Sequence, residues 1–381
     1  MNILVTVTNM TIANGGVNTH IIDLCEQLLI HGERVVLVTD ENQCDYDMAI
    51  DHLKENEKFV YFSVSMLGIQ SDIRKILYVA NQFCDVIKKY HIDLVHTHSQ
   101  SLCIVAEIVK LRMKVPYIWT NHIDAIASPK LFKIILQIFH FPIISVSTDL
   151  KKMLERNYKV PEDRITVVNN GINIGKFEPL SVNEKEILKK KWECKDNFVI
   201  GILARMVPIK GHRYLLKAID LIQKKYQISN IKLLVAGKVY DEAYLQEILW
   251  YSKENDIDMR YVGFQNPRDF FGICNISVLP SVLEGFGLTV LESLAMGCPV
   301  VRSDTPGYSD TKEITYVFKK EDVEGLAQYL VNAYKNQYEI QTMAKLGRKA
   351  VQEKFTIENQ VKETIKIYKN VINDENKRGV A

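Results

Sequence analysis

Two glutamates in one short block of the chain have the side chains and the spacing to bind an anionic, polyhydroxylated ligand. Glu284 and Glu292, with seven residues between them, lie in Pro280–Ser303, PSVLEGFGLTVLESLAMGCPVVRS, which predicts a strand, a glycine-containing turn, a helix and another strand. Gly287 and Leu288 open that helix, whose unpaired N–H groups and positive end form a ready anion site. Glu292 lies about one and a half turns further on, where its carboxylate can accept hydrogen bonds from ligand hydroxyls. Either glutamate alone would be read as a solvated surface carboxylate, but the whole block favours a ligand site.

Two basic residues supply a candidate clamp for a diphosphate. Arg205 and Lys210, five positions apart in LARMVPIKG, lie in the loop after a strand predicted at 198–203. Arginine offers a fork of donors and lysine a point charge, a combination that suits two phosphate groups. Taken alone, the segment could be an ordinary basic turn. Together with an anion-binding helix start in the same sheet, a phosphate site is the better explanation.

The N-terminal half carries fewer candidates. Gly15 and Gly16, in TIANGGV after the first predicted strand, permit the close backbone approach that phosphate- or sugar-binding turns need. His122, in WTNHID, follows a strand predicted at 117–120, so its imidazole is expected at a strand end, where it can hydrogen-bond a substrate hydroxyl or carbonyl. The chain has neither G-x-G-x-x-G nor G-x-x-x-x-G-K-[ST], which argues against an NAD dehydrogenase and a P-loop nucleotidase.

A metal site is not expected. His96 and His98 form an H-x-H pair whose rings share one face of a strand, but no third ligand is evident near them, so packing or hydrogen bonding is their expected role. The seven cysteines are odd in number and widely spaced, without a C-x2-C pair, which indicates neither a zinc site nor a disulfide framework. We therefore expect no metal and no cofactor.

Short β-rich runs alternate with amphipathic helical runs along almost the whole chain, the pattern of βαβ units in parallel sheets. We predict an α/β protein of two Rossmann-like domains facing a central cleft, at 1–175 and 176–355, with a charge-rich inter-domain region at 181–196. A terminal helix at 356–373 carries an apolar stripe and is expected to pack back on the first domain. Strands are predicted at 3–8, 34–39, 59–62, 94–97, 117–120, 143–146, 165–168, 198–203, 232–236, 260–262, 276–279 and 299–301.

The composition is that of an ordinary globular chain. Of 381 residues 47% are apolar and 25% charged, and the net charge of +2 is too balanced for the bulk electrostatics of a nucleic-acid binder. The N-terminus, MNILVTVTNM, lacks the basic start and cleavage site of a signal peptide. The longest uncharged stretch, between Lys133 and Asp149, falls short of the ~20 apolar residues that span a bilayer. We expect a cytoplasmic protein.

One segment of the first domain indicates contact with a membrane surface. Basic residues outnumber acidic ones between 105 and 160. Within KLFKIILQIFH, Lys130, Lys133, Gln137 and His140 form a narrow polar stripe, as in a helix that lies in a membrane interface; a core helix with a thin solvent edge fits equally well. The hypothesis is peripheral attachment to the anionic inner leaflet through 130–140 and a lipid-linked or cell-envelope acceptor.

These motifs closely resemble the large family four of retaining glycosyltransferases, which have the GT-B fold. The resemblance covers nearly the whole chain and is carried by LARMVPIKG, EGFGLTVLESLAMGCPVV, NGGV after the first strand and NNGIN before the inter-domain region. It implies transfer of a hexosyl group from a nucleotide-diphosphate sugar, with a UDP-sugar favoured, to a glycan or lipid-linked acceptor. It further implies retention at the anomeric carbon and no required metal.

The resemblance also implies a role for each candidate residue. Arg205 and Lys210 match the positions that neutralise the donor diphosphate. Glu292 matches the carboxylate that holds the ribose hydroxyls, and Glu284 the one beside the donor sugar. His122 matches the active-site histidine near the sugar, with His98 as a rival. The remaining matches are the donor-binding backbone of Gly285, Phe286, Gly287 and Leu288, the base-holding Val262 and Gly263, and the phosphate and acceptor loop with Gly15 and Gly16.

Two other classes of protein remain as alternatives. Another nucleotide-sugar enzyme with two Rossmann-like domains, such as an epimerase, would act on the donor alone, whereas a phosphorylase of the glycogen type would need a pyridoxal lysine and a far longer chain. A non-catalytic glycosyltransferase subunit would keep the fold with a degenerate site. The presence of Arg205, Lys210, Glu284 and Glu292 argues against that last alternative.

Overall fold

The computed structural model describes residues 1–10, 15–41, 47–66, 68–69, 72–123 and 129–380. Within them the chain forms two compact units. Unit 1 consists of Met1–Asn170 together with Ile357–Ala381, and unit 2 is Gly171–Thr356. The chain therefore passes between the units twice, at 170–171 and at 356–357.

Unit 1 is built on a parallel sheet with the strand order β3-β2-β1-β4-β5-β6-β7 among the described residues. In β1, Leu4 packs into one hydrophobic cluster while Ile3 and Val5 pack into another, because successive side chains point to opposite faces of a sheet. Both faces are covered by helices, so the strands are near-continuous apolar runs. The strands are β1 (Asn2–Val7), β2 (Arg34–Asp40), β3 (Phe59–Val64), β4 (Leu94–Thr97), β5 (Tyr117–Asn121), β6 (Ile143–Ser145) and β7 (Ile165–Val167).

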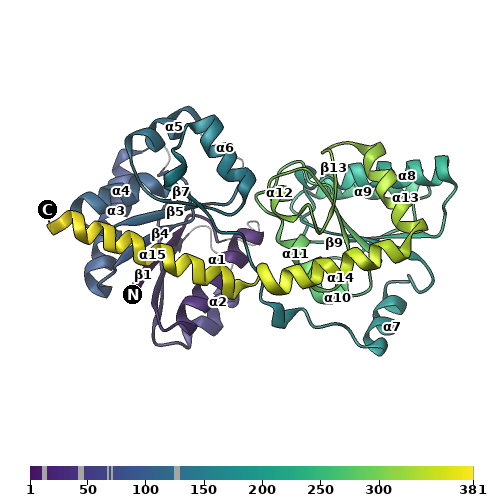
Figure 1. Cartoon of the computed structure of the whole chain (residues 1–381), viewed down its shortest axis with the longest axis horizontal. Coiled ribbons are helices and arrows are strands. Elements are labelled where there is room, and N and C mark those ends of the chain that lie inside the picture. The colour runs from purple at the N-terminus through teal and green to yellow at the C-terminus, as the bar shows by residue number, and fades with distance from the viewer. Residues whose placement is uncertain (11–14, 42–46, 67, 70–71, 124–128, 381) are drawn as a thin grey trace. The chain divides into compact units, whose positions relative to one another are not determined.

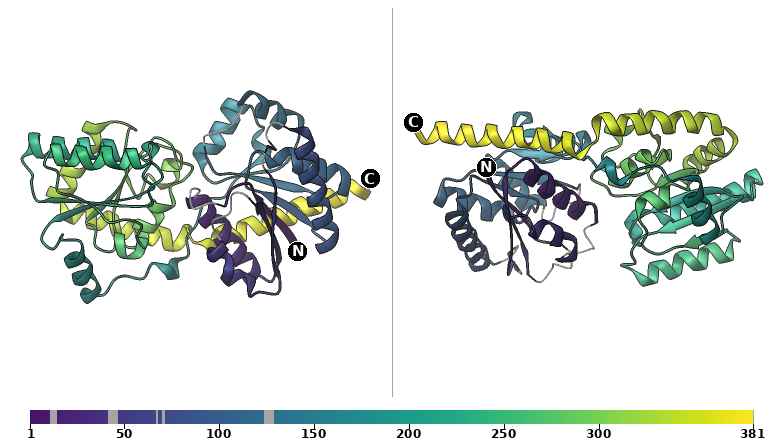
Figure 2. Two further views of the ribbon diagram at one scale, coloured as in Figure 1. Left: turned by 180° about the vertical axis from the view of Figure 1, so that it is seen from behind. Right: turned by 90° about the horizontal axis from the view of Figure 1, so that it is seen from below.

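The helices of unit 1 include the one that ends the chain, α15 (Ile357–Val380). Its predicted apolar stripe, Ile357, Val361, Ile365 and Tyr368, is buried in the same cluster as β1 and α1. Figures 1 and 2 show α15 lying along this unit, with α1 among the helices beside it. The other α-helices of unit 1 are α1 (Gly15–Ile30), α2 (Asp47–Lys54), α3 (Ile73–Tyr90), α4 (Leu102–Met113), α5 (Pro129–Ile138) and α6 (Thr148–Tyr158).

Unit 2 repeats the arrangement with a parallel sheet ordered β10-β9-β8-β11-β12-β13. Its strands are β8 (Phe198–Leu203), β9 (Ile231–Ala236), β10 (Met259–Tyr261), β11 (Ile276–Leu279), β12 (Val300–Ser303) and β13 (Tyr316–Phe318). Its α-helices are α7 (Val182–Lys191), α8 (His212–Tyr226), α9 (Glu242–Glu254), α10 (Pro267–Phe271), α11 (Leu288–Ala295), α12 (Tyr308–Thr311), α13 (Val323–Lys335) and α14 (Gln337–Lys354). The three-residue β13 was not predicted.

The charge-rich stretch 181–196 does not form the inter-domain region; that expectation is wrong. It contains α7 and belongs to unit 2. The Ser181 hydroxyl and the Glu184 carboxylate form a reciprocal capping box at the start of α7. After the helix, Trp192 and Cys194 are buried. The many charged residues of this stretch belong to the solvated face of a helix and not to a linker.

Helix α5 is the segment expected at a membrane surface. It buries Phe132, Ile135 and Leu136, whereas Leu131, Ile134 and Ile138 are 52%, 51% and 61% exposed. His140 lies beyond the last helical residue, so it is not part of the polar stripe assigned to it. Within the described part of the chain, no helix is both long and apolar enough to cross a bilayer.

Candidate active site

The candidate residues of unit 2 gather where its strand order reverses. β8 has β9 on one side and β11 on the other, and ligands of such open sheets bind at the carboxyl ends of the strands at this switch point. The loop after β8, 204–211, carries Arg205 and Lys210, and the loop after β11, 280–287, carries Glu284. Two segments some 75 positions apart in sequence thus leave the sheet at neighbouring strands.

Lys210 and Glu284 form a buried ion pair. Lys210 Nζ lies 2.5 Å from Glu284 Oε1, and the two side chains are only 14% and 10% exposed. The Ser281 hydroxyl donates to the same carboxylate oxygen at 2.8 Å. Burial acts to raise the pKa of Glu284, but the charge of Lys210 and these hydrogen bonds hold it below its usual value. Glu284 is therefore an ionised acceptor at neutral pH.

Backbone contacts hold the two loops of this pair together. The N–H of Val282 donates to the carbonyl oxygen of Ile209 at 2.9 Å. Gly211 has a φ of 76°, and a Cβ at that position would lie 2.0 Å from the carbonyl oxygen of Pro280. Only glycine allows this backbone approach. The final glycine of LARMVPIKG thus serves to bring Lys210 to Glu284.

Arg205 lies beside an aromatic ring that was not predicted from the sequence. Its guanidinium carbon is 6.0 Å from the ring centroid of Tyr240, and Lys238 Nζ is 5.6 Å from the same ring. Lys238 and Tyr240 follow β9 directly, so a position just after a strand was the signal that could have found them. Arg205, Lys210 and Lys238 therefore bring positive charge to one edge of the sheet, which suits an anionic ligand.

Val262 and Gly263 follow β10, two strands away from the Lys210 loop, or roughly 10 Å at ordinary strand spacing. The N–H of Val262 donates to Val235 O, and the N–H of Gly237 donates to Gly263 O, each at 2.9 Å. Gly237 is required because its Cβ would lie 1.9 Å from Ala204 O. The base-holding segment expected here is thus on the same sheet edge as the basic residues.

Helix α11 begins at this edge, as predicted from the glycine-containing turn. Gly287 caps it with a φ of 88° and no side-chain hydrogen bond. In the preceding turn Gly285 and Phe286 are buried, whereas Gly287 and Leu288 are half-buried. Glu292 is a half-buried residue in the second turn of the helix.

A fully buried arginine holds this turn in place. Arg302 Nη1 donates to Phe286 O at 3.2 Å and to Thr311 Oγ1 at 3.0 Å, and Nη2 donates to Thr305 O at 3.1 Å and Pro306 O at 3.0 Å. Arg302 was not predicted, because an arginine at the end of an apolar strand does not reveal that loop carbonyls will surround it. We infer that it shapes the turn at the start of α11.

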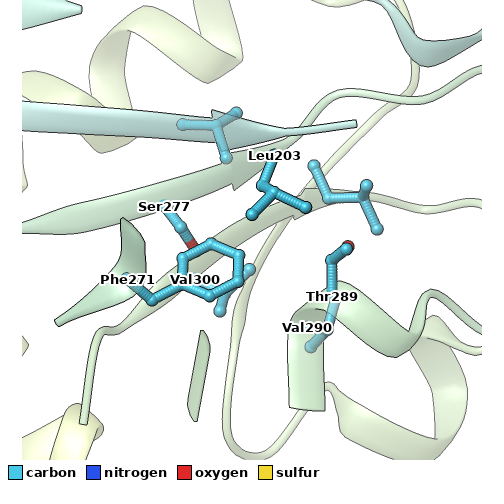
Figure 3. Close-up of a pocket in the computed structure, with 8 residues that line it drawn as sticks. Leu203, Phe271, Ser277, Thr289, Val290 and Val300 are labelled. Atoms are coloured by element: carbon cyan, nitrogen blue, oxygen red, sulfur yellow. The ribbon is translucent and has the colours of Figure 1, made fainter. Parts of the chain in front are cut away.

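The small void behind this edge is not a ligand site. It measures about 10 Å³, the room of one water at most. Figure 3 shows Leu203 of β8, Ser277 of β11, and Thr289 and Val290 of α11 around it. The candidate ligand-binding groups of unit 2 remain those at the strand ends.

Unit 1 brings three histidines together at its own switch point, between β1 and β4. His98 follows β4, His122 follows β5, and His20 is on α1. His98 Nδ1 and His122 Nε2 lie within hydrogen-bond distance at 2.8 Å. The His20 ring is 4.7 Å from that of His122 and 5.5 Å from that of His98. The two rival candidates, His98 and His122, are thus bonded to one another.

Helix α15 helps to fix this cluster. His20 Nδ1 is 3.0 Å from Asn170 Oδ1, and Gln360 Nε2 of α15 is 3.2 Å from the same nitrogen. His96, whose ring packs on that of His98 at 4.1 Å, contacts the Tyr368 hydroxyl of α15 at 2.5 Å through Nδ1. Hydrogen bonding was the predicted role of the H-x-H pair.

His98 of the H-x-H pair, but not His96, belongs to a second group of imidazoles. One ring nitrogen from each of His20, His98 and His122 lies within 4.8 Å of the others, so the three imidazoles could hold a transition-metal ion. The sequence hid this because His20 and His122 come from elements far from His98 along the chain.

Acid is expected to destabilise unit 1 through these histidines. Burial lowers the pKa of His20 to about 4 and that of His96 to about 3, and it lowers the pKa values of His98 and His122 well below 6.5. In the unfolded chain they titrate near ~6.5, so the unfolded state binds protons first and the free energy of unfolding falls as pH drops from ~6.5 towards ~4. Thermal unfolding at pH 7.5, 6 and 5, followed by circular dichroism, measures this. His96→Gln should flatten the slope and the exposed His140→Gln should not; equal slopes in all three proteins would contradict the assignment.

Gly15 and Gly16 open α1, with a φ of 29° at Gly15 and an exposed Gly16. The rest of the predicted loop, 11–14, lies outside the described residues. The candidate residues therefore form two groups, one at the switch point of each unit.

Comparisons with known proteins agree with this fold. Residues 14–176 match the family described as Glycosyltransferase Family 4, and residues 183–352 match Glycosyl transferases group 1. The capsular polysaccharide biosynthesis glycosyltransferase CapM of Staphylococcus aureus is 29% identical over 222 residues, which are 56% of this chain and 57% of CapM. A UDP-Gal:alpha-D-GlcNAc-diphosphoundecaprenol alpha-1,3-galactosyltransferase of Escherichia coli is 27% identical over 238 residues, 58% and 60% of the two chains. The matched region thus covers less than two thirds of the length of each of these relatives.

The solved structure of Anabaena HepE in complex with UDP and glucose superposes with a TM-score of 0.79 at 18% identity, covering 96% of this chain and 99% of that one. Two parallel-sheet units of this topology define the GT-B fold. The chain belongs to the glycosyltransferases that combine a Family 4 domain with a group 1 domain.

Proposed function

We propose that this protein is a retaining, metal-independent hexosyltransferase that moves a sugar from a UDP-sugar to a lipid-linked or cell-envelope glycan. The observation that carries the proposal is the buried Lys210–Glu284 pair beside Arg205 at the switch point of unit 2. This pair places a cation that suits a diphosphate next to a carboxylate that can accept hydrogen bonds from sugar hydroxyls.

In the proposed reaction the bond from the anomeric carbon to the diphosphate oxygen breaks, and the acceptor oxygen bonds to the same face of that carbon. The leaving diphosphate takes the acceptor proton. Arg205, Lys210 and the start of α11 stabilise the charge that grows on it, because they are positioned before the reaction begins. Glu284 and Glu292 accept hydrogen bonds from the donor sugar and the ribose.

On unit 1, His122 is proposed to contact the donor sugar, with Gly15 and Gly16 at the phosphate and acceptor. His98 bonds to the imidazole of His122 and would orient it, since a bond at one ring nitrogen decides the role of the other.

The relatives support the substrates proposed. The Escherichia coli enzyme is named for a UDP-Gal donor and a diphosphoundecaprenol acceptor, CapM for capsular polysaccharide, and HepE was solved with UDP and glucose. The exposed apolar side chains of α5, next to Lys130 and Lys133, support peripheral attachment to the inner face of an anionic membrane.

UDP-sugars are expected to raise the melting temperature more than GDP- or ADP-sugars do, in buffer that contains EDTA. A ligand at ~100 times its Kd stabilises a fold by about 2.7 kcal/mol. A thermal-shift panel of the three nucleotide classes measures this. A shift that required added Zn²⁺ or Mn²⁺ would overturn metal independence and direct attention to the three histidines of unit 1. No shift with any nucleotide sugar would favour a non-catalytic subunit.

A further inference from the structure

A cavity of about 230 Å³ lies at the carboxyl edge of the unit 1 sheet, and its lining is divided by chemistry. One part is polar, made by Thr8 after β1 and by Ser99, Gln100 and Ser101 after β4. The rest is apolar, with Ile104 of α4 and Leu131 and Phe132 of α5 among its side chains. Since about 10–15 Å³ of such volume is enough for one water, the cavity has room for a run of linked carbon atoms.

The polar part adjoins the histidine pair. Ser99 directly follows His98, which contacts His122, and the Ser99 hydroxyl accepts from the N–H of Thr8 at 2.9 Å. Helix α4 begins here at Leu102, without a side-chain hydrogen bond at its cap, so its positive end adds to the attraction for an anion. A phosphate bound at this end would lie next to the histidines assigned to the sugar.

The apolar part reaches the surface at α5. Leu131 lines the cavity and is still 52% exposed, and Ile134 and Ile138 continue the exposed apolar face. Lys130 and Lys133 lie on the same helix. An apolar surface beside lysines suits contact with an anionic membrane, from which a hydrocarbon chain would enter the cavity.

We propose that this cavity binds the hydrocarbon chain of a phosphate-bearing, lipid-linked acceptor, with the phosphate at Ser99 and Ser101 and the chain between α4 and α5. The inference deepens the proposed function and rests on it for the identity of the chain as an acceptor. Chain binding itself can be measured without transfer.

The test uses 12-bromododecyl phosphate, below its micellar concentration, as a fluorescence quencher. The Trp119 ring lies 5.1 Å from that of Phe132, which lines the cavity, so bromine beside Phe132 would come close enough to quench Trp119. Saturable quenching is expected in the whole protein. Ile104→Phe, which fills the cavity, should raise the Kd at least 10-fold, and Leu131→Gln should raise it several-fold. Leu111 lies on α4, the helix of Ile104, is 65% exposed and does not line the cavity, so Leu111→Gln should leave the Kd unchanged.

Three results would overturn the proposal: quenching that does not saturate, a Kd that is the same in Ile104→Phe and Leu111→Gln, or complete protection by equimolar inorganic phosphate. The UDP-sugar thermal shift should persist in Ile104→Phe. If the wild-type protein binds the alkyl phosphate but shows no nucleotide-sugar shift, the proposed transferase function fails and the cavity assignment stands.

Discussion

Replacing Lys210 by methionine is expected to raise the Kd for UDP about 10- to 100-fold, because a hydrogen bond to a charged group contributes roughly 1.5–3 kcal/mol. The substitution keeps the length of the side chain and removes the cation. It also leaves the buried carboxylate of Glu284 without its cation. The pKa of Glu284 then rises, and its carboxylate becomes a weaker hydrogen-bond acceptor. Isothermal titration with UDP measures the effect.

The matched control is Lys217→Met, which removes an exposed lysine from α8 in the same unit. It should bind UDP as the wild-type protein does. A Kd within twofold of wild type in Lys210→Met would remove Lys210 from the donor site. Melting temperatures of both variants show whether a loss of binding comes from a loss of folding.

Replacing Arg302 by methionine is expected to lower the free energy of unfolding of unit 2 by more than about 3 kcal/mol. The loop carbonyls of Phe286, Thr305 and Pro306 lose their donor. The first two of these bonds are buried and the third is partly buried, and each buried unsatisfied group costs about 1–3 kcal/mol. Urea unfolding followed by circular dichroism measures the change. UDP affinity should fall as well, because the turn at Phe286 leads into α11.

Arg74→Met provides the comparison, since the Arg74 side chain is 88% exposed. Its effect should stay within about 0.5 kcal/mol, as is usual for surface substitutions. A stability of Arg302→Met equal to that of Arg74→Met would mean that the turn does not depend on this arginine.

The positions of the site residues along the chain could be predicted because they follow strands. In a parallel sheet all carboxyl ends lie at one edge, so a residue just after a strand has a defined place before any contact is known. Arg205 after β8 and His122 after β5 were located in this way. The same rule would have found Lys238 after β9. It failed at 181–196, where a charged, solvated helix has the composition of a linker.

The sequence by itself determined the alternation of strands and helices, the glycines at which loops approach one another, and the two glutamates and two basic residues of unit 2. Local patterns suffice for these features, because periodicity and turn chemistry act over a few residues. Only the tertiary structure decided which side chains form hydrogen bonds or ion pairs with one another. The bond of Lys210 to Glu284 and the contact of His20 with Gln360 join residues 74 and 340 positions apart. Such partners depend on strand order and on the return of α15 to unit 1, which no local pattern encodes.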